Sequence, residues 1–116
     1  MPFFALVRVL LTLAAAPPAS PAICENIAEY QLAPCLQKAV VKLDAELNRT
    51  YRALFVSLSP DIQKTLRESE RAWIHSRDAD LGLFASFPHG NDPTNSEYWE
   101  EIRLIQARID YLKGLQ

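Results

Sequence analysis

The sequence is poor in glycine and cysteine and has no marked excess of either charge. It holds 3 Gly and 2 Cys in 116 residues, and 12 basic against 14 acidic side chains give a net charge of −2. This composition argues against a glycine-rich phosphate loop, a zinc site of four cysteines and a dense disulfide scaffold. Because no basic field is available to neutralise phosphates, we do not expect nucleic acid as a partner.

A long hydrophobic run is also missing. The first 22 residues hold Arg8, an apolar run over residues 9–16 and then a small, proline-rich stretch. This order is typical of a signal peptide, and the run is shorter than the ~20 apolar residues that span a bilayer. Small residues at Ser20 and Ala22 predict cleavage after Ala22. The alternative is an apolar N-terminal helix packed on the domain.

Cleavage after Ala22 would leave a single domain over residues 23–116 with a net charge of −3 and no stable membrane insertion. Its core would be thin, so a covalent link would contribute much of the stability. The two cysteines of an exported chain are expected to pair, and Cys24 with Cys35 closes a ring of 12 residues. A redox or metal-binding pair fits less well, because the spacing is not Cys-x-x-Cys. We predict no metal and no other cofactor.

Hydrophobic periodicity predicts three helices, whose apolar stripes run from Leu36 to Leu58, from Ile62 to Phe84 and from Tyr98 to Leu112. Pro34 suits the first turn of the first helix, Ser59 and Pro60 separate the first two, and residues 86–96 form a loop. A short helical turn is expected over residues 25–31.

These elements predict an all-α fold, a small antiparallel three-helix bundle whose short N-terminal helical segment is tied by one disulfide. The expected core consists of Leu36, Val40, Leu43, Leu47, Tyr51, Leu54, Ile62, Leu66, Trp73, Ile102, Ile105 and Ile109.

Two motifs occupy the first two helices: Leu43-Asp44 with Glu46-Leu47-Asn48 and Tyr51, and Arg71, Trp73 and Arg77-Asp78. With the early cysteine pair, they make residues 24–80 resemble the LprI-like family of small exported domains. The resemblance implies a helical fold outside the cytoplasm, and lysozyme inhibition is attributed to few members. The chain departs from the family pattern at Glu70, where Gln is usual, and it lacks the second cysteine pair.

The motif side chains lie at helical spacing and could form a polar layer of Asp44, Asn48, Tyr51, Glu70, Arg71, Trp73, Arg77 and Asp78. Arg77 could bind Asp44 or Asn48 across the helices, with Trp73 packed over its stem. Such a layer would specify helix register. The other interpretation is a recognition patch of Arg71, Trp73 and Arg77.

The loop after the second helix holds an acidic, proline-stiffened segment made of Phe87, Pro88, His89, Gly90, Asn91 and Asp92. A stiffened segment can enter a cleft at a lower entropic cost than a flexible one, which makes this a candidate partner-binding loop. The alternative is a plain connector between helices.

No catalytic arrangement is recognisable, so we do not predict an enzyme. We predict an exported binding protein of the lysozyme-inhibitor type, whose partner is lysozyme or another envelope or host protein. Its negative charge favours approach to a basic lysozyme. The alternative is an envelope structural or interaction module that acts through an exposed aromatic surface around Trp99. The sequence does not indicate the oligomeric state.

Overall fold

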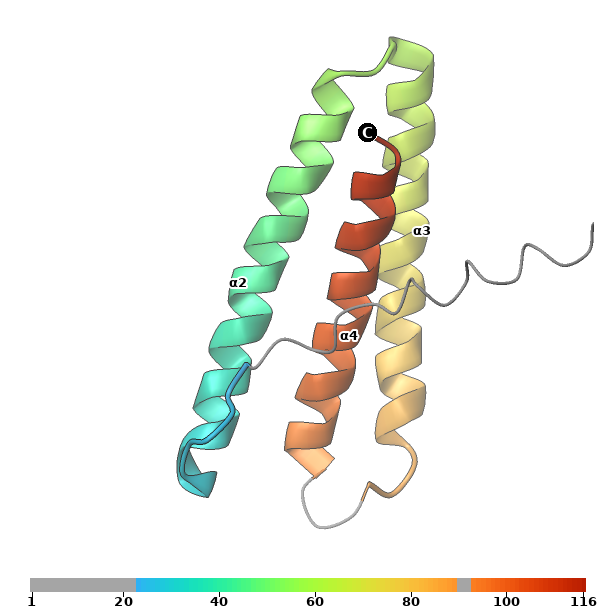
Figure 1. Ribbon diagram of the computed structural model, residues 1–116. Coiled ribbons are helices and arrows are strands. Elements are labelled where there is room, and N and C mark those ends of the chain that lie inside the picture. The colour runs from blue at the N-terminus through green and yellow to red at the C-terminus, as the bar shows by residue number, and fades with distance from the viewer. Residues whose placement is uncertain (1–22, 90–92) are drawn as a thin grey trace, which may run out of the picture.

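The computed structural model describes residues 23–89 and 93–116, and these contain three helices and no strand. The helices are α2 (Glu29–Val56), α3 (Pro60–Ala85) and α4 (Pro93–Gly114). α2 and α4 run in the same direction and α3 runs antiparallel to both (Figure 1). The predicted all-α antiparallel three-helix bundle is therefore confirmed. The proposed signal peptide, residues 1–22, lies outside the described residues.

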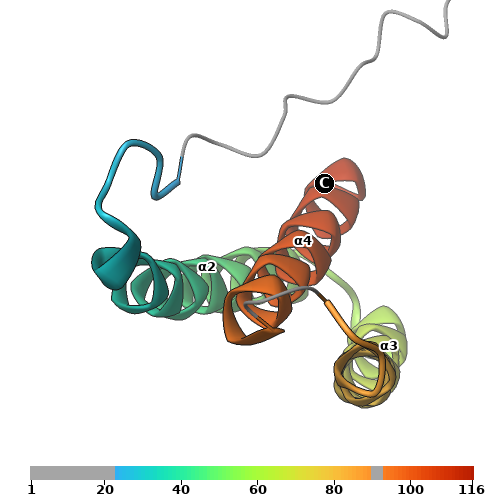
Figure 2. The same cartoon turned by 90° about the horizontal axis from the view of Figure 1, so that it is seen from below.

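α4 is the central helix of the bundle. It packs most extensively on α2 and less on α3, whereas α2 and α3 contact each other least. The view along the bundle shows α4 between the other two helices (Figure 2). The buried apolar side chains are Leu36, Leu43, Leu47 and Leu54 of α2, Leu66 of α3, and Ile102, Ile105, Ile109 and Leu112 of α4. The main hydrophobic interface is thus the one between α2 and α4.

The first helix begins earlier than the proline suggested. α2 starts at Glu29, so the helical turn expected over residues 25–31 is its beginning, and Pro34 lies inside it. Proline lacks the N–H that would bond to the Tyr30 carbonyl. Tyr30 is 80% exposed, where water can serve that carbonyl. At the other junction, Ser59 is the N-cap residue of α3 and Pro60 occupies N1, although the Ser59 side chain makes no capping bond.

The predicted core is confirmed except at Ile62. The other members are buried or pack, partly buried, against the buried cluster. Ile62 is 53% exposed, so its assignment to the core was wrong. It lies in the first turn of α3, where it lines an open apolar depression with Leu58, Tyr111 and Leu115 instead of being covered by another helix.

Three polar side chains, Thr50, Asn95 and Arg108, are buried although the stripes did not predict it. The Thr50 hydroxyl donates a hydrogen bond to the Glu46 carbonyl oxygen at 2.9 Å. This bond within α2 allows a polar residue to lie in the α2–α4 interface.

Candidate functional site

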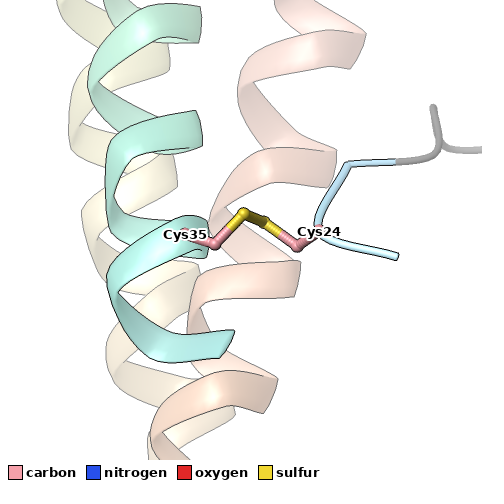
Figure 3. Close-up of a disulfide and its surroundings, with 2 residues drawn as sticks. All are labelled: Cys24 and Cys35. Carbon is pink, nitrogen blue, oxygen red and sulfur yellow. A yellow bond between two sulfur atoms is a disulfide. The ribbon is translucent and has the colours of Figure 1, made fainter. Parts of the chain in front are cut away.

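A disulfide joins Cys24, which precedes α2, to Cys35 in the second turn of that helix (Figure 3). The Cα atoms are 5.9 Å apart. Cys24 and Asn26 have φ angles of 64° and 57°, in the left-handed region, and so turn the chain back toward α2. The predicted structural disulfide is confirmed, and neither thiol is left for redox or metal chemistry.

The second motif is tied to α4 by an ion pair that the sequence did not reveal. Arg108 Nε donates to Glu70 Oε1 at 2.9 Å, and Arg108 Nη2 donates to Ser69 Oγ at 3.1 Å. The Arg108 and Glu70 side chains are only 8% and 14% exposed. Loss of either partner would leave a nearly buried charge without compensation, so this pair is a strong constraint on how α3 lies against α4.

Trp73 lies between two guanidinium groups. The Arg77 and Arg108 guanidinium carbons are 5.2 and 5.7 Å from the centre of its ring. Arg108 also lies 5.3 Å from the centre of the Tyr111 ring. These distances allow cation–π attraction, which adds to the ion pair in fixing the position of Trp73. Trp73 is partly buried and so offers a partner only part of its ring.

Arg77 does not make the contact expected across the first two helices. In the described part of the chain its guanidinium donates to Asp78 Oδ1 at 3.1 Å, and not to Asp44 or Asn48. Asp44 and Asn48 are exposed on α2. The physical reason is that α4 lies between α2 and α3 (Figure 2), so a motif side chain buried on α3 meets α4 instead.

Charges from α2 and α3 act on Glu101 of α4. Burial raises the pKa of its carboxyl group, Arg77 opposes that change, and Asp44 and Asp78 raise the pKa further. Because electrostatic effects of this kind weaken with distance, Asp44, Arg77 and Asp78 are the motif charges close enough to act on Glu101.

The two motif helices contact each other near their short connection. The Arg67 guanidinium carbon lies 5.4 Å from the centre of the Phe55 ring, and Gln63 Nε2 donates to the Phe55 carbonyl oxygen at 2.8 Å. Tyr51 stacks on Phe55, with ring centres 5.9 Å apart. Tyr51 therefore supports this junction, and the contact shows which sides of α2 and α3 face each other.

The exposed polar residues of both motifs lie on the sides of α2 and α3 that face each other near their connection. On α2, Asn48 and Asp44 lie seven and eleven residues before Phe55, a spacing that places them on the same side of the helix as Phe55. On α3, Arg71 and Asp78 lie four and eleven residues after Arg67 and therefore share the side of Arg67. All four of these motif residues are exposed. We infer that they share one side of the molecule, and we call them the motif face.

The start of the candidate loop is attached to the end of α3. The His89 ring stacks on Phe84 with centres 3.7 Å apart, and His89 Nε2 donates to the Phe84 carbonyl oxygen at 2.6 Å. Phe87 and Pro88 are exposed. Gly90, Asn91 and Asp92 lie outside the described residues.

Trp99, the centre of the alternative aromatic surface, is partly buried and packs against the core. It therefore presents only part of its ring to solvent, which limits the aromatic area available there.

The family comparison covers this whole arrangement. A family model described as "Lysozyme inhibitor LprI" matches residues 24–112. The chain belongs to the LprI family. The match includes the disulfide, both motifs and Arg108. No curated protein and no solved structure matches the chain.

As an LprI-family protein the chain is similar to proteins described as inhibitors of an enzyme, and the family together with the disulfide indicates an extracytoplasmic location. Within residues 23–89 and 93–116, no three His, Cys, Asp or Glu side chains come together to hold a metal. None of the helices in those ranges is long and apolar enough to cross a bilayer.

Within the described residues of this LprI-family chain, sequence reasoning missed the buried Arg108 and its pairing with Glu70. Arg108 lies three residues after Ile105 and next to Ile109, at the edge of the apolar stripe of α4. A charged side chain at the edge of an apolar stripe usually extends into solvent. Its closeness to the stripe is the only signal in the sequence that Arg108 could be buried.

Proposed function

We propose that this LprI-family chain is an exported protein that binds and inhibits lysozyme outside the cytoplasm. The observation that carries the proposal is the match to the lysozyme-inhibitor family, which runs from the first cysteine to Leu112, the last buried core residue. The disulfide supports an oxidising compartment. The excess of acidic residues suits a basic partner, because opposite charges speed association.

The motif face is the surface that we assign to lysozyme binding. Its two carboxylates, Asp44 and Asp78, are exposed and lie near the half-buried Glu101, so this surface is locally acidic. Arg71 contributes a long exposed side chain beside them. The exposed Phe87 and Pro88 follow the C-terminal end of α3 and would add apolar contacts to lysozyme there.

We expect purified residues 23–116, with the disulfide formed, to reduce lysozyme activity in a cell-wall lysis assay as their concentration rises. Asp44→Asn should weaken inhibition several-fold, chiefly by slowing association, and the effect should shrink at high salt. The matched control is Asp61→Asn, which removes an equally exposed carboxylate in the first turn of α3, outside the motif face.

The absence of inhibition at a large molar excess, with the helical fold and disulfide verified, would contradict the proposal for the lysozyme tested. The alternative, an envelope interaction module without inhibitory activity, would then be the better description. Equal effects of Asp44→Asn and Asp61→Asn would instead argue for a general charge effect and against the motif face.

We propose in addition that residues 1–22 are a signal peptide removed after Ala22, and that the mature protein is periplasmic or secreted. The family match beginning at Cys24 supports this division. Mass spectrometry of the protein recovered from outside the cytoplasm should show a chain that starts at Ile23, carries no lipid and lacks the two thiol hydrogens. A mass that includes residues 1–22 would contradict cleavage.

A further inference from the structure

α3 is the helix that the hydrophobic core holds least. Within the described chain, Leu66 is its only buried apolar residue, whereas α2 and α4 each contribute four. α3 also packs less extensively on α4 than α2 does. Elements with few buried apolar contacts open at a lower free energy than the rest of a fold. Opening of α3 away from a persisting α2–α4 pair is therefore the least costly local unfolding of this bundle.

The remaining attachments of α3 are largely polar, and the most buried of them converge on one residue of α4. Arg108 binds the Glu70 carboxylate and the Ser69 hydroxyl and lies over Trp73. The other polar attachments of α3, Gln63 and Arg67 at Phe55, lie near the α2–α3 connection, where the short link already keeps the helices together. The Arg108 contacts thus hold the middle of α3.

We propose that Arg108 is a positioning residue for partner binding, which holds α3 so that Arg71 and Asp78 stay on the same side of the molecule as Asp44 and Asn48. The inference rests on the proposed function, in which the motif face binds lysozyme. Arg108 is 7% exposed, so it acts through the helix it holds and not by touching the partner. Arg71 directly follows Glu70 in the sequence, so displacement of Glu70 would move Arg71 with it.

If Arg108 only stabilised the fold as a whole, its loss would speed the opening of α3 and of α4 alike. The α2–α4 interface contains eight of the nine buried apolar residues and does not depend on Arg108 for apolar contact. Loss of Arg108 should therefore raise the opening of α3 selectively and not that of α4. Preorganised binding surfaces lose affinity when the bound conformation is only partly populated, so inhibition should weaken by the factor by which the population with α3 in place falls.

The test combines hydrogen exchange resolved by helix with the lysozyme assay. Arg108→Met removes the charge and the hydrogen bonds but keeps an unbranched side chain. We expect it to speed exchange in α3 about ten- to hundredfold relative to α4, the range expected for lost hydrogen bonds to charged groups, and to weaken inhibition as the population with α3 in place falls. Arg108→Lys should restore part of both, since it keeps the charge beside Glu70. Glu70→Gln keeps an oxygen that can accept from Arg108 but removes its countercharge, so its effect should lie between those of Arg108→Lys and Arg108→Met.

The control is Ile109→Val, which removes one buried methylene from the α2–α4 interface and should speed exchange in α4 several-fold while leaving exchange in α3 and the inhibition unchanged. If Arg108→Met does not fold, the double variant Glu70→Gln with Arg108→Met, which leaves no unpaired buried charge, takes its place with the same expected result.

A fall in the population with α3 in place without a matching loss of inhibition would overturn the positioning role, as would weaker inhibition without that fall. If the unaltered protein does not inhibit lysozyme, the proposed function fails, and the positioning role for that partner fails with it. The exchange data then still decide separately whether Arg108 holds α3.

Discussion

Replacement of Ile105 by alanine is expected to lower the free energy of unfolding by about 2–5 kcal/mol. Ile105 is fully buried on the central helix α4. Truncation would remove buried apolar contacts and leave a cavity in the main interface of the bundle. Urea unfolding followed by far-ultraviolet circular dichroism measures the loss as a lower midpoint with an unchanged slope.

The same truncation at Ile62 is the matched control. Ile62 is 53% exposed, so Ile62→Ala should cost less than about 1 kcal/mol. Equal losses at the two positions would contradict the arrangement in which α4 is the central helix and the first turn of α3 is left open.

This pair of residues shows what hydrophobic periodicity can predict. The stripes correctly assigned Leu36, Leu47, Ile105 and their neighbours to the core, because a three- or four-residue period places side chains on one face. Periodicity does not show whether another helix covers that face. Ile62 belongs to a regular stripe, but its end of α3 extends past the tightly packed part of the bundle.

The motif residues show a second limit. Their spacing suggested common faces, and we expected Arg77 to bind Asp44 or Asn48 across the first two helices. The structure places α4 between them, so Glu70 binds Arg108 across 38 positions of sequence. No local pattern links those two residues. The pairing could be found only from the tertiary arrangement, which also leaves Asp44 and Asn48 exposed.

The disulfide, by contrast, followed directly from the sequence, since a chain with an apparent signal peptide and two cysteines has a single intramolecular pairing. Its effect should be large for so small a domain. Reduction, or the double variant Cys24→Ser with Cys35→Ser, is expected to lower the free energy of unfolding by roughly 3 kcal/mol, the value that chain entropy gives for so short a ring.

The stability difference should arise mainly in the unfolded chain, because the bridge restricts that chain, whereas apolar packing buries Leu36, next to Cys35, in the folded core. Urea unfolding of the oxidised protein, the reduced protein and the double serine variant checks this. The last two should agree, and the serine variant should not respond to reductant. A reduced protein as stable as the oxidised one would contradict the expected contribution. The size of that contribution bears on location, since in a reducing compartment the domain would lose this stabilisation and fold more weakly.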